Sequence, residues 1–283
     1  MPSPNRPVTT LDKDEILAGL FASWNAIDRL LAELPEISWQ IPTPLPDWAV
    51  RDVVAHIIGT ESMLLGIATP EPDVDVTTLE HVHNDIGARN EFWIRHLHEE
   101  PDAALLARLR DVTGHRRAML TKMIPEAWNA LTQTPAGPDS YGRFMRVRVF
   151  DCWMHEQDIR DALSRPSADD DLTGPDTTLA LDEVEAGMGF VVGKLGKAPD
   201  GARVLIDLTG SPARSIRVAV DGRAAVVEDF AAQAPTVTIR LDGLQFTRLC
   251  GGRPMTTARP HAIDYDGDIE AGTRIVANLA YAI

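Results

Sequence analysis

The sequence has few cysteines, few aromatic residues and no long run of apolar residues. Its two cysteines, Cys152 and Cys250, are too few and too far apart for a disulfide framework, so we expect reduced thiols with structural roles. No apolar run approaches the roughly 20 residues that a membrane-spanning helix needs. The first 15 residues also lack the apolar segment of a signal peptide. We therefore expect a cytoplasmic protein that does not enter a membrane.

Basic charge is also scarce. The chain has 27 Lys and Arg against 42 Asp and Glu, which gives a formal net charge of −15. No run of five or six basic residues offsets this, so nucleic acids and anionic membrane surfaces are excluded as expected partners. Apolar residues make up 44% of the chain, which is enough for real cores. The length of 283 residues favours two domains.

Helical periodicity dominates the first 165 residues. Asp12, followed three residues later by Glu15, predicts a helix start, and apolar residues then recur at helical spacing until Pro35. Long amphipathic segments with turn-rich connections are typical of a helix bundle, predicted here over residues 1–165. The further helices are predicted at residues 50–68, 80–99, 102–124 and 141–164.

The pattern changes after residue 165. Residues 166–176 are polar and turn-prone, which predicts a linker. Residues 177–283 are predicted to form a small α+β domain with an antiparallel sheet, because strand patterns of period two lie between helical segments. Those helical segments are expected at about 177–194, 243–250 and 268–281. The fold class expected for the whole chain is α+β in two domains.

The stretch RVFDCWMHEQDIRDAL, residues 148–163, concentrates side chains that bind metals. Asp151 and His155 are four residues apart and therefore share one helix face, where they can reach a single divalent cation. A third ligand must come from elsewhere, and His56 is the natural donor because it lies among apolar residues in VRDVVAHIIGTE. The alternative is that both histidines are merely hydrogen-bonded within the bundle core.

The remaining charges of this stretch receive separate predictions. Asp158, three residues after His155, is expected to orient a ring nitrogen of that histidine. Glu156 and Asp161 lie off the ligand face and are expected to face solvent. Arg160 is expected to pair with an acid or to hold the helix end, with a surface salt bridge as the alternative.

Two of these motifs resemble a known family. WAVRDVVAHIIGTE, followed about 90 residues later by RVRVFDCWMHEQDIRDAL, is similar to the mycothiol-dependent maleylpyruvate isomerase family, and LCGGRP with GDIEAGTRIVANLAYAI extends the likeness over nearly the whole chain. The resemblance implies a DinB-like four-helix bundle followed by a sterol-carrier-protein-like domain. It also implies that His56, Asp151 and His155 bind a divalent metal, usually zinc, although Asp151 replaces the glutamate of the isomerase.

The resemblance further implies a thiol chemistry. Mycothiol becomes the expected cosubstrate, activated as a metal-bound thiolate, and Arg253 of GGRP is implied to contact the thiol or an acidic substrate. Because Asp151 departs from the family pattern, we expect a metal-dependent mycothiol S-transferase acting on a small electrophile. A cis/trans isomerase of the maleylpyruvate type, a metal hydrolase and a non-catalytic small-molecule carrier or sensor stay open as alternatives. We expect a monomer or a small homo-oligomer.

Overall fold

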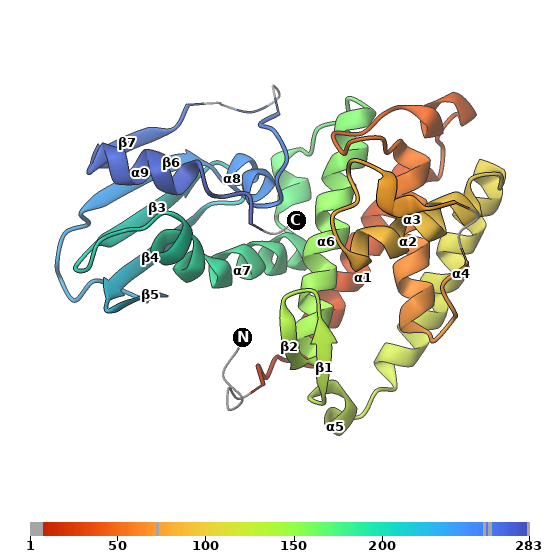
Figure 1. Cartoon of the computed structure of the whole chain (residues 1–283), viewed down its shortest axis with the longest axis horizontal. Coiled ribbons are helices and arrows are strands. Elements are labelled where there is room, and N and C mark those ends of the chain that lie inside the picture. Colours follow the sequence, from red (N-terminus) through yellow and green to blue (C-terminus); the bar gives the residue numbers. More distant parts are fainter. Residues whose placement is uncertain (1–7, 72–73, 257–258, 260–261, 282–283) are drawn as a thin grey trace. The chain divides into compact units, whose positions relative to one another are not determined.

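The chain forms two compact units, Met1–Arg165 and Pro166–Ile283. A computed structural model describes residues 8–71, 74–256, 259 and 262–281. Unit 1 is mainly helical, whereas unit 2 combines helices with a five-stranded sheet (Figure 1). None of the described helices is both long enough and apolar enough to cross a membrane.

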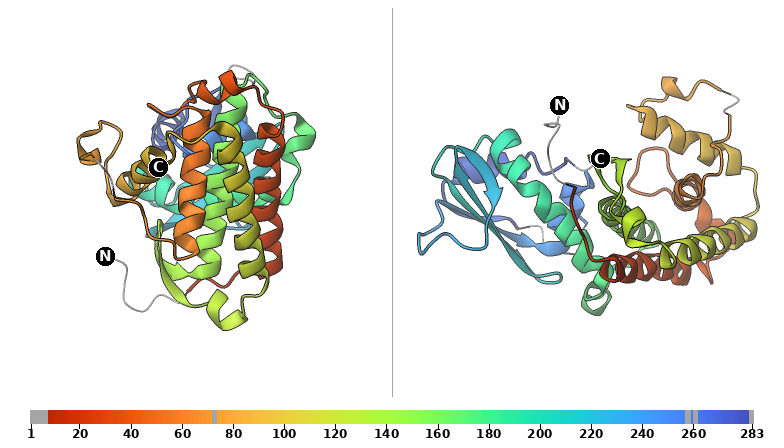
Figure 2. Two further views of the ribbon diagram at one scale, coloured as in Figure 1. Left: turned by 90° about the vertical axis from the view of Figure 1, so that its right-hand side faces the viewer. Right: turned by 90° about the horizontal axis from the view of Figure 1, so that it is seen from below.

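Four long helices form the frame of unit 1. Its elements are α1 (Lys13–Leu31), η1 (Glu36–Gln40), α2 (Val50–Leu64), η2 (Val76–Thr78), α3 (Asp85–Leu97), α4 (Asp102–Thr121), α5 (Pro125–Trp128), β1 (Leu131–Thr134), β2 (Gly137–Ser140) and α6 (Tyr141–Ala162). Helix α1 packs against α6, and α2 packs against α4 and the shorter α3. The left view of Figure 2 shows α1, α2, α4 and α6 running side by side, so the predicted helix bundle is confirmed.

Local sequence signals set the starts of α1 and α6. The Asp12 carboxylate accepts a hydrogen bond from the backbone N–H of Glu15 at 2.8 Å, which confirms the predicted helix start. Ser140 caps α6 in the same way, because its hydroxyl accepts from the backbone N–H of Arg143 at 3.0 Å. Helices α2 and α3 are shorter than predicted, since they end at Leu64 and Leu97 instead of near residues 68 and 99.

Helices α2 and α3 approach each other closely at Gly59. A Cβ atom built on Gly59 would lie 2.4 Å from the buried ring of Trp93 on α3, which is closer than two carbon atoms can pack. Glycine is therefore required at this position by the packing of the two helices.

Residues 131–140, within one of the turn-rich connections of the sequence, form a hairpin. Strands β1 and β2 pair antiparallel in register from Leu131 opposite Ser140 to Thr134 opposite Gly137. Gly137 has φ +98°, a left-handed conformation that glycine adopts without steric cost. Pro135 and Ala136 form the two-residue turn between the strands, and β2 leads directly into α6.

Unit 2 is built around one five-stranded sheet. Its elements are η3 (Asp169–Leu172), α7 (Pro175–Phe190), η4 (Val191–Leu195), β3 (Arg203–Thr209), β4 (Arg214–Asp221), β5 (Arg223–Val226), β6 (Val237–Asp242), α8 (Gly243–Cys250), β7 (Asp264–Gly267) and α9 (Ile269–Val276). The predicted linker at residues 166–176 contains η3 and the first residues of α7. The predicted final helix at 268–281 is shorter, because α9 ends at Val276.

The sheet has the strand order β5-β4-β3-β6-β7. Every neighbouring pair is antiparallel except β3 and β6, which are parallel. The predicted antiparallel sheet is therefore confirmed apart from this one pair, which arises because the chain leaves the edge strand β5 and returns on the far side of β3. Every second residue of β3 is buried in the core, namely Val204, Ile206 and Leu208, while the residues between them are more exposed. This alternation is the period of a half-buried strand.

Candidate metal centre

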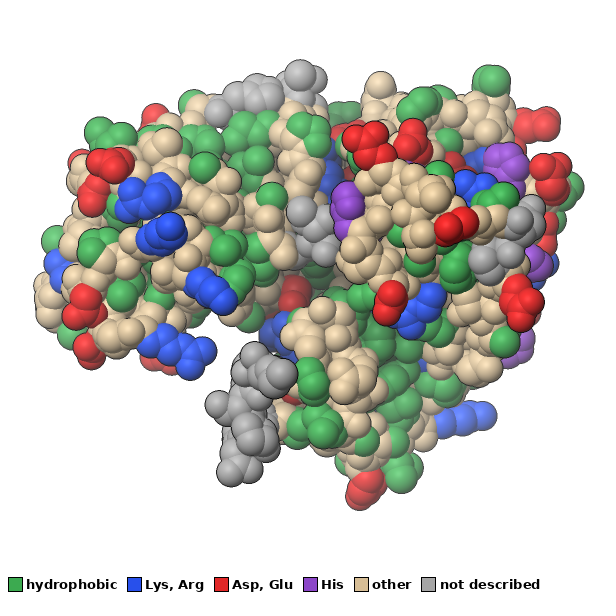
Figure 3. All heavy atoms as spheres, viewed as in Figure 1, with side chains coloured by type: hydrophobic (Ala, Val, Ile, Leu, Met, Phe, Trp, Pro, Cys, Tyr) green, Lys and Arg blue, Asp and Glu red, His purple; other side chains and the backbone are tan. Residues whose placement is uncertain are grey.

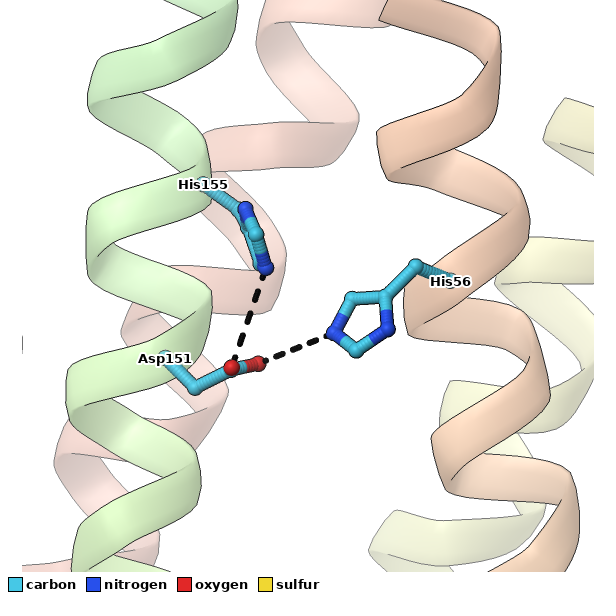
Figure 4. A group of neighbouring side chains, drawn as sticks. All are labelled: His56, Asp151 and His155. Carbon is cyan, nitrogen blue, oxygen red and sulfur yellow. Dashed lines mark hydrogen bonds and ion pairs between the residues drawn. The ribbon is translucent and has the colours of Figure 1, made fainter. Parts of the chain in front are cut away.

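The structure brings His56, Asp151 and His155 together inside unit 1 (Figure 4). His56 lies in the middle of α2, whereas Asp151 and His155 lie one turn apart on the facing side of α6. One donor atom from each residue lies within 4.8 Å of the other two. Nε2 of His56 is 3.4 Å from Oδ2 of Asp151, and Nε2 of His155 is 3.7 Å from Oδ1.

His56 is held as a neutral imidazole. It is almost fully buried, and burial lowers its pKa, with the Asp151 carboxylate opposing this shift only in part. Within the described part of the chain, its Nδ1 has no hydrogen-bond partner. A hydrogen-bonded core histidine accounts poorly for this arrangement, because one nitrogen lacks a partner and the other is 3.4 Å from its acceptor.

Asp158 orients His155. Nδ1 of His155 lies 3.1 Å from Oδ2 of Asp158, whose side chain is fully buried. A carboxylate only accepts hydrogen bonds, so Nδ1 carries the proton of this contact, and Nε2 faces Asp151 and His56. This contact has the geometry that the spacing of the two residues predicted.

Arg148 keeps Asp151 ionised. Burial by itself raises the pKa of Asp151, but Arg148, together with His155 and His56, outweighs it and holds that pKa well below its usual range. Nη1 of Arg148 donates to Oδ2 of Asp151. The pKa of Arg148 is itself raised despite burial, because Cys152, Asp151 and Glu61 lie around it. The site therefore contains a permanent carboxylate anion.

Trp48 forms one wall of the site. Its ring lies 5.4 Å from the ring of His56 and 6.2 Å from that of His155, measured between centroids. Its Nε1–H donates to Oε1 of the buried Glu91 at 3.0 Å, and the same oxygen lies 2.9 Å from Nε2 of His81. The sequence interpretation missed Trp48. This residue ends the proline-rich stretch IPTPLPDW, residues 41–48, which leads into α2.

Among the other residues near the site, Glu156 differs from its prediction, whereas Arg160 and Cys152 agree with theirs. Glu156 is buried, so its predicted solvent exposure is wrong, and it accepts a hydrogen bond from Nε of Arg160 at 2.8 Å. Cys152 is fully buried, and burial raises its pKa to about 12 in spite of the nearby Arg148. The Cys152 thiol therefore stays protonated at neutral pH and is no nucleophile.

Arg253 lies in unit 2, directly after α8. Its backbone N–H donates to the carbonyl of Arg248 at 2.9 Å, and its Nη1 donates to the carbonyl of Gly251. These contacts define the turn that follows α8. The predicted contact of Arg253 with a thiol or an acidic substrate stays a prediction.

The donor set fits a divalent cation. Two imidazole nitrogens and one carboxylate oxygen are a combination that zinc accepts, and three protein ligands are typical of zinc sites that keep one position open. The charge states fit as well, because His56 is neutral and Asp151 is ionised. His56 and Asp151 are thus ready to bind a cation without first losing a proton.

The fold and this cluster together define a two-unit protein with a candidate metal centre in a helical bundle. Residues 20–160 match the model of the mycothiol maleylpyruvate isomerase N-terminal domain, and residues 178–272 match that of the MDMPI C-terminal domain. The two matches span most of the chain. The chain therefore belongs to the mycothiol maleylpyruvate isomerase family.

Individual relatives are more distant. Two uncharacterized proteins of Mycobacterium tuberculosis, from strains CDC 1551 / Oshkosh and H37Rv, are each 26% identical over 152 residues, which is 54% of this chain and 58% of each relative. The chain thus spans little more than half the length of these relatives. A crystal structure of the mycothiol-dependent maleylpyruvate isomerase superposes with a TM-score of 0.58 at 15% identity, covering 90% of this chain and 93% of that one. This likeness supports the fold.

Proposed function

We propose that the chain is a metal-dependent mycothiol S-transferase that joins the thiol to a small electrophile. Membership of the family supports an enzyme of the isomerase or thiol-transferase kind and supports mycothiol as the thiol. The observation that carries the metal dependence is the cluster of His56, Asp151 and His155, whose donor atoms lie within 4.8 Å of one another.

Each side chain of the cluster has a defined part. Nε2 of His56, a carboxylate oxygen of Asp151 and Nε2 of His155 would hold the cation. A divalent cation bound there lowers the pKa of a thiol, as it does for water, so that sulfur is available as a thiolate near neutral pH. Trp48 covers one side of the two imidazoles, which restricts access of water to them.

The transfer itself is a substitution at carbon. The thiol proton passes to solvent, the sulfur forms a bond to the electrophilic carbon, and the leaving group departs with the electron pair of its bond. The protein's own thiols take no part, because Cys152 and Cys250 are fully buried and burial raises the pKa of both.

A cis/trans isomerase is the second candidate, and the family match favours it. In that reaction the thiol sulfur adds to a conjugated double bond, the resulting single bond rotates, and the sulfur then leaves, so that no thiol is consumed. The shorter arm of Asp151, compared with the glutamate that the family resemblance implies, is the feature that favours transfer over isomerisation.

The test combines metal analysis with turnover. Purified protein is assayed for zinc by elemental analysis, and for mycothiol-dependent conversion of a chlorodinitrobenzene and of maleylpyruvate. We expect about one zinc per chain, and we expect His56→Ala, Asp151→Ala and His155→Ala to lose both metal and turnover. His115→Ala is the matched control, because His115 is an exposed residue of α4 that pairs only weakly with Asp111.

Each outcome separates the candidates. Consumption of thiol with loss of chloride supports the transferase, whereas conversion of maleylpyruvate without consumption of thiol supports the isomerase. Turnover without added thiol points to a metal hydrolase, and bound metal without any turnover points to a carrier. Full activity in all three alanine variants would refute the site.

A further inference from the structure

A row of buried charged side chains leads inward from the metal centre. Nε and Nη2 of Arg148 donate to Oε1 of Glu61 at 3.0 and 2.8 Å, while its Nη1 donates to Asp151. Oε2 of Glu61 accepts from Nε of Arg116 at 2.8 Å, and Nη1 of Arg116 donates to the Tyr141 hydroxyl at 3.0 Å. A continuous series of hydrogen bonds therefore connects α6, α2 and α4.

Stability alone does not account for this row. The side chains of Glu61 and Arg116 are 0% exposed and that of Arg148 is 4% exposed. Moving each ion out of water costs several kcal/mol, and apolar residues of similar volume often stabilise a core equally well. The outer end of the row indicates its role, because Arg148 contacts the carboxylate that faces His56 and His155.

We propose that Arg148 is the positioning residue of the metal centre, an inference that rests on the metal site proposed above. Its guanidinium donates to Oδ2 of Asp151, which also lies 3.4 Å from Nε2 of His56. Oδ1, which lies 3.7 Å from Nε2 of His155, is then the carboxylate oxygen offered to the cation. Glu61 holds the guanidinium by two hydrogen bonds, and Arg116 in turn holds Glu61.

Two consequences follow for the chemistry of the site. The carboxylate would contribute a single oxygen, so that two imidazole nitrogens and one oxygen would hold the cation and a thiol could supply a further ligand. The positive charge of Arg148 also offsets the negative charge of Asp151. The cation therefore keeps more of its own charge for its fourth ligand, which favours an anionic sulfur over a neutral one.

The test uses variants that change the charge or the shape of the Arg148 side chain. Arg148→Met alone leaves Glu61 with one partner, so the double variant Glu61→Gln/Arg148→Met removes one negative and one positive charge together. Arg148→Lys keeps the charge but lacks the planar fork that reaches both carboxylates. Arg160→Met is the matched control, because Arg160 pairs with Glu156 on the same helix and that pair includes no metal ligand.

Two measurements are made on protein whose folding is verified by circular dichroism. Zinc affinity is measured by competition with a chromophoric chelator, and the visible spectrum is recorded after substitution with cobalt(II). We expect the double variant and Arg148→Lys to bind zinc about 10- to 100-fold more weakly. In the cobalt spectrum, absorption should fall as the released Oδ2 of Asp151 becomes a second oxygen donor. Arg160→Met should match the wild type in both.

The proposal is overturned if both Arg148 variants fold and bind zinc with wild-type affinity and a wild-type cobalt spectrum. It is also overturned if Arg160→Met weakens binding as much as they do. Failure of the proposed function has a different signature. Wild-type protein that binds zinc tightly but shows no thiol-dependent turnover refutes the transferase and leaves the role of Arg148 intact.

Discussion

Glu61→Gln is expected to destabilise unit 1 strongly, because it removes the one carboxylate shared by two buried arginines. Glu61 accepts three hydrogen bonds of 2.8 to 3.0 Å from Arg116 and Arg148. Glutamine has nearly the same shape, so the change leaves no cavity. It removes the negative charge, however, and turns an N–H₂ group toward one of the two guanidinium groups, which have no lone pair to accept it.

The size of the effect follows from burial. Breaking a buried ion pair by neutralising one partner costs about 3–5 kcal/mol, because a charge is left uncompensated in the core. For a unit of this size, 1 kcal/mol lowers the melting temperature by roughly 2–4 °C, so a decrease of roughly 6–20 °C is expected. Thermal unfolding followed by far-ultraviolet circular dichroism measures it, since unit 1 contains the long helices.

Asp28→Asn is the matched control. Asp28 pairs with Nε of Arg110 at 2.6 Å, which is shorter than each of the three hydrogen bonds to Glu61. The side chains of Asp28 and Arg110 are, however, 39% and 52% exposed. Exposed pairs contribute about 0–1 kcal/mol. If Glu61→Gln lowers the melting temperature no more than Asp28→Asn does, burial is not what determines the strength of these pairs, and the reasoning is wrong.

Three other predictions concern the site and its surroundings. Asp158→Asn should weaken zinc binding about 10- to 100-fold in a chelator competition, because the amide no longer fixes the ring tautomer of His155; unchanged affinity would contradict the role of Asp158. Gly59→Ala should lower the unfolding free energy by about 1–3 kcal/mol through overpacking against the α3 indole. Gly114→Ala, in open space on α4, should instead raise it by about 0.5–1 kcal/mol. If denaturant titrations show that both variants change the unfolding free energy in the same direction, this contrast is refuted. Cys152 and Cys250 should react with a thiol reagent at pH 8 only after unfolding, since burial raises the pKa of both; rapid labelling of native protein would show otherwise.

The prediction for Glu156 failed for a specific physical reason. An amphipathic helix was expected, with one buried face and one solvated face. Helix α6 instead lies inside the unit, and every residue from 152 to 159 is buried, Glu156 and Asp158 included. Spacing along one helix identifies residues that share a face. It does not reveal how many faces the neighbouring helices cover.

The sequence by itself determined the elements and the pair of ligands that one helix contains. Capping residues and apolar periodicity are local signals, so the start of α1 and the shared face of Asp151 and His155 followed from them. Tertiary structure decided the rest. His56 is 95 residues from Asp151, and only the packing of α2 beside α6 brings their side chains together.

The same packing selects the partners that act on Asp151. Glu61 and Arg148 are ordinary charged residues in their own helices, and nothing in their local sequence marks them as buried partners. They meet because α2 and α6 turn these positions inward, where low polarity forces each charge to find an opposite one. Local spacing therefore identified the two candidate ligands on α6, whereas the charge and orientation of the Asp151 carboxylate were set by contacts between helices distant in the sequence.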